Sequence, residues 1–312
     1  MKKMAFLFPG QGSQAVGMGL DLYQAYDFAK EIFDQADEIT QINISDLCFS
    51  GPMVDLTQTI NLQPAITAVN LALLSVLNQK GIKADVCAGH SLGEYSALCA
   101  AGIVSVTDTL RLVFKRGQLM HREAEVHKGA MQAMVGLPIE TVTEIVSKFD
   151  GAVSVANHNS AQQIVITGAP EAVKRAGVLA KEQGGKAIPL KVSGAWHSDL
   201  IKGAKEDFRR YLDTIEFSIP QYPVLHNVTV DACSDPDKIK TLLVTQLCNP
   251  VRWYDTICKM IADGVEIFVE VGPGKVLSGL AKKIIPSDYS VQIFNVNDLA
   301  SVEAFCQKAT SL

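Results

Sequence analysis

The sequence has little net charge and no cysteine pattern typical of a metal site or a disulfide-rich protein. Its 28 basic and 33 acidic side chains give a formal charge of −5, which provides no general attraction to nucleic acid. The seven cysteines are scattered, with no C-x-x-C pair and no metal-ligand spacing with histidine. We therefore expect reduced thiols in a cytoplasmic protein, no metal ion and no nucleic-acid partner.

Hydrophobic runs long enough for secretion or membrane insertion are also missing. Only four apolar residues lie between Met4 and Pro9, too few for the core of a signal peptide. The most apolar later stretch, residues 64–77, is interrupted by polar residues and predicts a buried helix rather than a membrane span. With 312 residues, 48% of them hydrophobic, the chain is long enough for one large domain, or one large and one small.

The order of apolar and helix-like segments predicts an α/β fold. Residues 5–8 and 84–88 are strand candidates, and each is followed by a Gly-rich turn and a segment of helical composition. Residues 224–228 and 266–271 are strand candidates nearer the C-terminal end. The sequence contains no internal repeat or low-complexity tract.

The middle of the chain has the order strand, helix, strand, strand, helix, strand. The six segments are residues 130–137, 138–149, 153–157, 163–167, 170–183 and 186–192. This βαββαβ order matches a ferredoxin-like unit, and two glycines stand after the second helix, where a C-cap is expected. We therefore expect a small ferredoxin-like domain at residues 126–198, inserted into a large domain formed by residues 1–125 and 199–312.

Gly89-His90-Ser91-Leu92-Gly93 fits the nucleophile-elbow pattern G-x-S-x-G. Glycines on both sides let the backbone turn sharply from strand to helix and leave the serine hydroxyl exposed. The N–H of Leu92, at the start of the following helix, would point at an oxyanion formed beside Ser91. A chance match is the alternative, but the strand before and the helix after favour a functional site.

A serine nucleophile needs a base, and the chain has six histidines. His197 is the strongest candidate because it lies in a turn-prone segment where the two domains would form a cleft. A surface or packing histidine is the alternative. No aspartate between Ser91 and His197 is an evident third member, so a dyad oriented by an amide or a carbonyl is as consistent as a triad.

The Gly-rich loop at residues 8–14 lacks the Walker lysine and the G-x-G-x-x-G spacing, which excludes a nucleotide fingerprint. Its N–H groups could complete an oxyanion hole, and a plain tight turn is the alternative.

A later helical segment carries four basic residues. For Arg111, Lys115 and Arg122 a solvated face is the favoured interpretation. Arg116 is a candidate for a buried guanidinium that grips a carboxylate with two parallel hydrogen bonds.

Together these segments resemble one protein family along nearly the whole chain. The matching motifs are Phe8–Gln14, Gln63-Pro64-Ala65, Gly89–Glu94, Arg116-Gly117, Ser193–His197, Gln246 with Asn249–Trp253, and Glu270–Gly274. In this order and spacing they resemble the malonyl-CoA:acyl carrier protein transacylases, the acyltransferases of fatty acid and polyketide synthesis. Seven collinear motifs are far more specific than any one of them.

The resemblance implies a hydrolase-like α/β domain with a central, mostly parallel sheet and an inserted ferredoxin-like domain. It also implies a ping-pong transfer of malonyl from malonyl-CoA to an acyl carrier protein. Ser91 would be the nucleophile, His197 its base and Gln246 the residue that orients His197. No cofactor is implied on this chain, because the partner carries the phosphopantetheine.

Further roles follow from the same resemblance. The N–H groups of Gln11 and Leu92 would form the oxyanion hole, and Arg116 would bind the malonyl carboxylate. Candidate pocket-lining residues are His90, Gln63, Asn159 and Trp196. Trp196 is larger than the residue associated with its position in the family, which would narrow or reshape the acyl site.

An acidic carrier protein would meet a local basic patch on this chain. The candidates are Lys181, Lys186 and Lys191 in the small domain, or Lys202, Lys205, Arg209 and Arg210 after it. Each set is equally consistent with a solvated surface.

Two alternatives to a malonyl transferase are an editing acyl hydrolase and a catalytically silent interaction module. An editing acyl hydrolase would admit water to the acyl-enzyme and release stalled acyl groups from carrier proteins, but a carboxylate clamp at Arg116 is of no use for clearing acetyl groups. A catalytically silent interaction module would not require Ser91, His197, Gln246 and Arg116 together.

Overall fold

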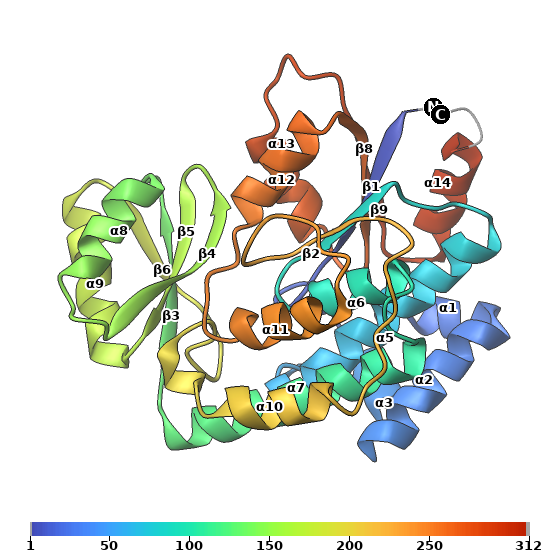
Figure 1. The fold of residues 1–312 in the computed structure, drawn as a ribbon, viewed down its shortest axis with the longest axis horizontal. Coiled ribbons are helices and arrows are strands. Elements are labelled where there is room, and N and C mark those ends of the chain that lie inside the picture. The colour runs from blue at the N-terminus through green and yellow to red at the C-terminus, as the bar shows by residue number, and fades with distance from the viewer. Residues whose placement is uncertain (1, 310–312) are drawn as a thin grey trace.

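Two separate β-sheets organise residues 2–309, the part of the chain that the computed structural model describes (Figure 1). The predicted large domain includes residue 1 and residues 310–312, which lie outside the described part. One sheet is parallel and the other antiparallel, and helices surround both. The predicted α/β class, with a central parallel sheet, is confirmed.

The larger sheet has five parallel strands in the order β7-β2-β1-β8-β9. Their bounds are β1 Lys3–Phe8, β2 Val86–Gly89, β7 Val224–Leu225, β8 Val265–Val271 and β9 Gln292–Val296. The three central strands are apolar and mostly buried, as is usual for parallel strands covered on both faces. Because neighbouring parallel strands end at the same edge, the loops after β1, β2 and β8 lie together there.

Helices cover both faces of this sheet, and alternate residues of β1 face the two layers. Phe6 and Phe8 belong to a core cluster with one set of helices, whereas Ala5 and Leu7 belong to a second cluster. The helices that share the first cluster are α1 Leu20–Ala25, α2 Asp27–Thr40, α3 Ile44–Ser50, α4 Met53–Leu56, α5 Thr59–Gln79, α6 Gly93–Ala100, α7 Val106–Val126, α10 Ala204–Leu212, α11 Pro236–Gln246 and α14 Leu299–Ala309. The opposite face is covered by α12 Trp253–Ala262 and α13 Val276–Ile284.

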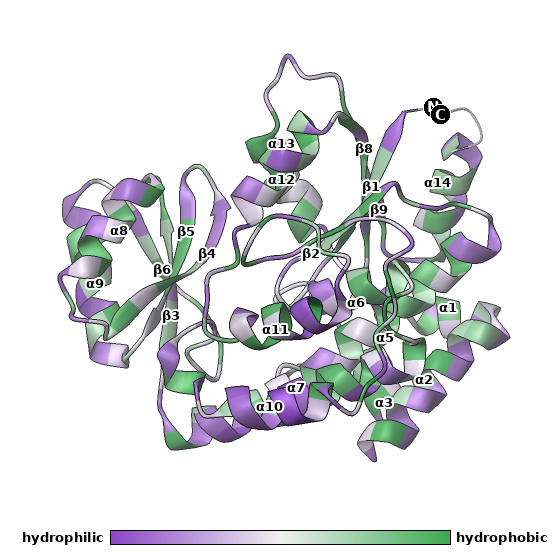
Figure 2. Ribbon diagram, in the orientation of Figure 1, coloured by the Kyte–Doolittle hydropathy of each residue, from purple (hydrophilic) through white to green (hydrophobic). Residues whose placement is uncertain are grey.

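Helix α5 runs through the centre of the first layer. By length and composition it could cross a membrane, but 83% of its apolar window is buried inside the protein. The predicted buried helix at residues 64–77 is therefore confirmed, and it extends further in both directions. Figure 2 shows the contrast with α10, whose visible surface is largely hydrophilic.

The smaller sheet is antiparallel, with the strand order β4-β5-β3-β6. Its elements are β3 Ala130–Val135, α8 Ile139–Ser147, β4 Val153–Ser160, β5 Gln163–Gly168, α9 Pro170–Glu182 and β6 Lys186–Pro189. They follow one another in the predicted order, and both helices pack with the strands in a separate core cluster. A bridge between Asn157 of β4 and Val251 links this sheet to the segment before α12.

The structure differs from the sequence-based expectation mainly in where elements begin and end. The residue pattern at positions 21–39 predicts one continuous helix, but Tyr26, whose backbone is extended, divides this segment into α1 and α2. The strands expected at residues 186–192 and 224–228 end early, at Pro189 and Leu225. Strand β9 was not predicted, because this edge strand is only partly buried and alternates polar and apolar residues weakly. The 3-10 turn η1, Asp199–Ile201, follows the second sheet.

Candidate active site

Ser91 lies on a sharp turn between β2 and α6, and its backbone is left-handed, with φ 51°. The flanking glycines make this turn possible: a Cβ at Gly89 would lie 1.9 Å from the carbonyl carbon of Gly93. A Cβ at Gly93 would lie 1.9 Å from the carbonyl oxygen of Phe8. Asn227 secures the turn, because its Oδ1 accepts from the Ser91 N–H at 2.7 Å and its Nδ2 donates to the Gly89 carbonyl at 2.7 Å. The strand, turn and helix that the elbow pattern requires are all present.

His197 contacts Ser91 directly. Its Nε2 lies 2.8 Å from Ser91 Oγ, and its Nδ1 lies 2.9 Å from the main-chain oxygen of Gln246. A carbonyl oxygen can only accept, so Nδ1 carries the proton and Nε2 is free to accept one. Gln246 thus orients His197 through its main chain, and not through its side chain. Like Ser91, His197 has a left-handed backbone, with φ 61°.

Burial keeps the imidazole of His197 uncharged. The residue is 4% exposed, and burial, followed by the positive charge of Arg116, lowers its pKa to about 3. The ring is therefore neutral near pH 7, and the Nε2 lone pair faces the serine hydroxyl.

The guanidinium of Arg116, on α7, is completely buried beside Ser91. Its Nη2 donates to Ser91 Oγ at 3.2 Å and to Gln246 Oε1 at 3.1 Å, and its Nη1 donates to Gln63 Oε1 at 2.8 Å. It lies 5.5 Å from the ring centroid of Tyr95. Within residues 2–309 its Nε has no hydrogen-bond partner and no acidic side chain forms an ion pair with it. A buried cation with only neutral partners has the charge and the donors that a carboxylate ligand would satisfy.

The loop after β1 lies against the elbow. A Cβ at Gly10 would be 2.5 Å from the carbonyl oxygen of His90 and 3.4 Å from the nitrogen of Leu92, so the loop approaches this closely only with glycine. The backbone N–H groups of Gln11 and Leu92 donate to no acceptor in the described part of the chain. Both remain available to an oxyanion beside Ser91.

A cavity of about 350 Å³ opens next to the elbow. Its lining includes Gln11 from the loop after β1, His90 from the turn after β2, Asn159 from β4, and Lys283 from α13. The Nε2 of His90 lies 2.8 Å from Asn159 Oδ1, which links the elbow to the smaller sheet. The cavity therefore lies where the two sheets meet.

Known proteins resemble this chain along nearly its whole length. The sequence profile of the acyl transferase domain family matches residues 5–296. A malonyl CoA-acyl carrier protein transacylase from Bacillus subtilis is 46% identical over 288 residues, which cover 91% of this chain and 91% of that protein. The chain belongs to the malonyl-CoA:acyl carrier protein transacylase family.

Solved structures of this transacylase family share the fold. An acyl carrier protein S-malonyltransferase from Vibrio cholerae matches with a TM-score of 0.91 and 45% identity, covering 97% of this chain and 99% of that one. A malonyl-transacylase in complex with a type II PKS acyl-carrier protein matches with a TM-score of 0.93 and 39% identity, covering 98% and 99%. The resemblance drawn from the seven motifs is confirmed.

His90 and Asn159 line the cavity, as predicted for two of the four candidate pocket residues. Gln63 instead lies beside Arg116, and its Nε2 donates to Thr59 Oγ1 at 2.9 Å. Trp196 requires a correction, because it is 4% exposed and belongs to the main core cluster. A Cβ at Gly194 would be 2.6 Å from the indole of Trp196, so the ring fits there because residue 194 is glycine. Trp196 is not among the residues that line the cavity.

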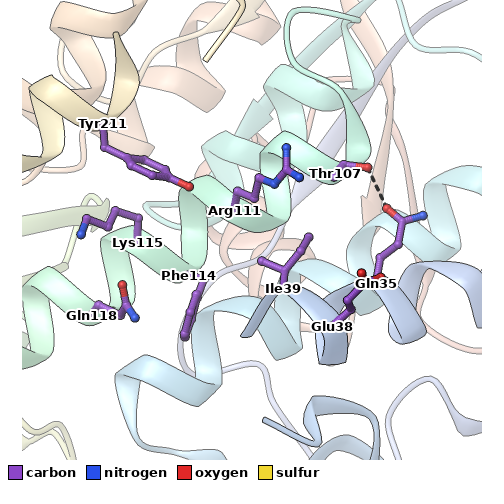
Figure 3. Close-up of a pocket in the computed structure, with 9 residues that line it drawn as sticks. All are labelled: Gln35, Glu38, Ile39, Thr107, Arg111, Phe114, Lys115, Gln118 and Tyr211. Atoms are coloured by element: carbon purple, nitrogen blue, oxygen red, sulfur yellow. Dashed lines mark hydrogen bonds between the residues drawn. The ribbon is translucent and has the colours of Figure 1, made fainter. Parts of the chain in front are cut away.

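The other basic residues of α7 face away from Ser91. Arg111 and Lys115 line a separate surface cavity of about 480 Å³ beside α2 and α10 (Figure 3). Arg111 pairs with Asp108 at 3.0 Å, and Lys115 lies 5.7 Å from the ring centroid of Tyr211. Arg122 is paired with acidic side chains. The predicted difference between Arg116 and its basic neighbours is thus visible in the fold.

Sequence patterns assign no role to three residues of this site: Glu94, Tyr95 and Asn227. Tyr95 stacks near the Arg116 guanidinium, and Asn227 holds the elbow. Glu94 is linked to Asn227 by a hydrogen bond across 133 residues of sequence, so no local pattern reveals the contact. The available signal is an acidic residue in the otherwise uncharged helix α6.

Proposed function

We propose that this protein transfers a malonyl group from malonyl-CoA to the phosphopantetheine thiol of an acyl carrier protein, through a malonyl ester on Ser91. The observation that carries the proposal is the buried Arg116 guanidinium, 3.2 Å from the Ser91 hydroxyl and without an acidic partner among residues 2–309. When the thioester carbonyl of malonyl-CoA is at Ser91, its free carboxylate is close enough to pair with this cation. Acetyl-CoA has no group that would do so.

The first half-reaction forms the acyl-enzyme. His197 Nε2 takes the proton of Ser91 as Oγ attacks the thioester carbonyl carbon. The negative charge that develops on the carbonyl oxygen is stabilised by the N–H groups of Gln11 and Leu92. The carbon–sulfur bond then breaks, CoA receives the proton from His197, and malonyl-Ser91 remains.

The second half-reaction repeats these steps with the carrier thiol. The thiol gives its proton to His197, and its sulfur attacks the ester carbonyl carbon. The bond to Ser91 Oγ breaks, and the serine recovers the proton. Because substrate and partner supply both thiols, we expect no metal or cofactor on this chain.

Malonyl binding also makes His197 a stronger base. Burial is the main cause of its lowered pKa, and the charge of Arg116 is the second. A substrate carboxylate on Arg116 cancels much of that charge, so the pKa of His197 rises toward its usual value when the correct acyl group is bound.

An editing acyl hydrolase is not favoured. Such an enzyme would act on acyl groups without a carboxylate, and a buried guanidinium at the nucleophile would then be a cost without a function. The relatives compared above are named as transferases.

A basic patch beside the cavity would receive the acidic carrier protein. Arg209 and Arg210 are paired with acids on α10 or just after it, which leaves them little free charge. Lys191 follows Leu190, which lines the cavity beside Ser91. We therefore expect the patch of Lys181, Lys186 and Lys191 to be used rather than the alternative set, which consists of Lys202, Lys205, Arg209 and Arg210.

We also infer a hydrolase-like large domain of residues 1–125 and 199–312, with a ferredoxin-like small domain of residues 126–198 inserted. The elbow on a parallel sheet supports the first assignment, and the strand order β4-β5-β3-β6 with two helices supports the second. All seven cysteines are free thiols, which supports a cytoplasmic location.

Intact-protein mass spectrometry tests the proposed function. The protein is mixed with malonyl-CoA or acetyl-CoA, with and without holo acyl carrier protein. We expect a malonyl adduct that is stable in water and moves to the carrier, and little acetyl adduct. Rapid loss of the adduct to water, or a preference for acetyl, would support the editing hydrolase instead.

A further inference from the structure

Glu94 lies at the centre of the buried network behind Ser91, although the mechanism above gives it no step. It is 1% exposed and stands in the first turn of α6. Its Oε1 lies 2.8 Å from Nδ1 of His226, which is itself completely buried. Its Oε2 accepts hydrogen bonds from Gln246 Nε2 at 2.6 Å and from the Asn227 N–H at 3.2 Å. One carboxylate thus holds three donors from two distant segments of the chain.

The side-chain amide of Gln246 joins this carboxylate to the guanidinium of Arg116. Its Nε2 donates to Glu94, and its Oε1 accepts from Arg116 Nη2 at 3.1 Å. A carboxylate only accepts and a guanidinium only donates, so the two charged groups permit one orientation of the amide. Reversing the amide would place its oxygen against the carboxylate and its NH₂ against the guanidinium.

The same amide also reaches the elbow. Gln246 Nε2 lies 3.0 Å from the main-chain oxygen of Ser91 and 3.3 Å from Asn227 Oδ1. The main-chain oxygen of Gln246 receives the hydrogen bond from His197. A shift of Gln246 would therefore displace both groups that contact the serine hydroxyl, His197 and Arg116.

We propose that Glu94 is a positioning residue for malonyl selectivity: through the Gln246 amide it holds the Arg116 guanidinium at the side of Ser91 where the malonyl carboxylate binds. The inference rests on the proposed function, because it gives Glu94 a part in malonyl binding at that site. Glu94 touches no substrate and acts through Gln246. A purely structural role at the start of α6 would support the fold without affecting the choice of acyl group.

The test compares kcat/KM for malonyl-CoA and acetyl-CoA in Glu94→Gln. A glutamine can present its own NH₂ to Gln246, so it no longer fixes the Gln246 oxygen toward Arg116. We expect the malonyl-to-acetyl ratio of kcat/KM to fall about tenfold or more, and Glu94→Asp, which keeps the charge, to recover part of it. An equal loss for both substrates, or no loss, would overturn the proposal.

Glu270→Gln is the matched control. Glu270 is also completely buried in the larger sheet, and it accepts hydrogen bonds from the N–H groups of Leu277 at 2.9 Å and Ser278 at 2.8 Å. It has no hydrogen bond to Gln246 or Arg116 in the described part of the chain. We expect a lower melting temperature with an unchanged malonyl-to-acetyl ratio. Equal changes of the ratio in Glu94→Gln and Glu270→Gln would show a structural role only.

A double-mutant cycle isolates the proposed link. Gln246→Met removes the amide and keeps the main-chain oxygen, so alone it should lower the ratio by about the same factor as Glu94→Gln. The double variant should lower it no further, and fully additive effects would contradict the proposal. If Glu94→Gln does not fold, an unchanged ratio in Gln246→Met decides against the link. Failure of the proposed function is distinguishable, because it would appear as missing malonyl transfer in the unaltered protein.

Discussion

Two of the arginines of helix α7, Arg116 and Arg122, lie six residues apart in opposite surroundings. Arg116 is completely buried next to Ser91 and has only uncharged hydrogen-bond partners among the described residues. The side chain of Arg122 is 46% exposed and forms ion pairs with Glu123 at 2.8 Å and Asp207 at 2.6 Å. Among the described residues, the positive charge of Arg122 is therefore paired with acidic side chains, whereas that of Arg116 is not.

The difference shows how the fold reserves a charge for a ligand. An arginine at the surface is solvated or paired at little net gain or cost. A buried guanidinium without a direct ion pair is expensive, so its presence indicates a further partner that binds there. A carboxylate on the substrate is such a partner.

The largest effect is expected from a substitution of Ser91, which lies beside Arg116. Ser91→Ala removes the only oxygen that can form the ester, so malonyl transfer should fall by about 10⁴-fold or more. Mass spectrometry should find no adduct, while the fold and the buried position of Arg116 should be unchanged. Labelling of another residue in this variant would contradict the assignment of Ser91.

The next effect separates the two arginines. Arg116→Ala should lower kcat/KM for malonyl-CoA about 10²-fold, because a charged hydrogen-bonded pair is lost, while acetyl-CoA changes little. Arg116→Lys should not restore malonyl transfer, since an ammonium cannot make two parallel hydrogen bonds. Arg122→Ala is the control, and a change of its malonyl-to-acetyl ratio would erase the distinction.

A pH profile sharpens the same comparison. Arg116 disfavours the protonated form of His197, so removing it should raise the pKa of the imidazole, although burial keeps it below the usual value. The acid limb of kcat/KM for acetyl-CoA should therefore move to higher pH in Arg116→Ala. In Arg122→Ala the profile should match that of the unaltered protein. A limb that stays in place in both variants would mean that the charge of Arg116 does not reach His197.

The smallest effect is expected for substitution of the exposed Arg122. Arg122→Ala removes exposed ion pairs between α7 and α10, which contribute little in water and less at high salt. The melting temperature should fall by about 2 °C or less, measured by calorimetry at low salt. A much larger fall would show that this pair stabilises the fold as strongly as buried contacts do.

Local patterns predicted most of the fold. Short-range signals predict the strand, turn and helix at Ser91 and the six elements from β3 to β6. These signals are apolar runs, flanking glycines and Pro170 at a helix start. The weakly covered edge strand β9 and the break at Tyr26 have no such signal. Their positions are determined by what packs beside them.

The site was predictable to the extent that each residue stands in its own motif. Ser91, His197 and Arg116 were found in this way, and the structure brings them together. The partners that hold them were not, because Glu94 meets Gln246 across 152 residues and Asn227 meets Ser91 across 136. Long-range hydrogen bonds leave no periodicity in the sequence, and the size of Trp196 alone did not reveal that Gly194 accommodates it.

The left-handed backbone at Ser91 and His197 bears on which substitutions these two positions would tolerate if the reaction were no longer needed. Any residue with a Cβ is disfavoured there by about 1 kcal/mol relative to glycine. Exchange of Ser91 for glycine would relieve this strain, so a chain that no longer needed the reaction could lose this serine without losing stability at the turn. His197 differs, because glycine there would also empty the space of a buried imidazole and leave the Gln246 carbonyl without its hydrogen bond.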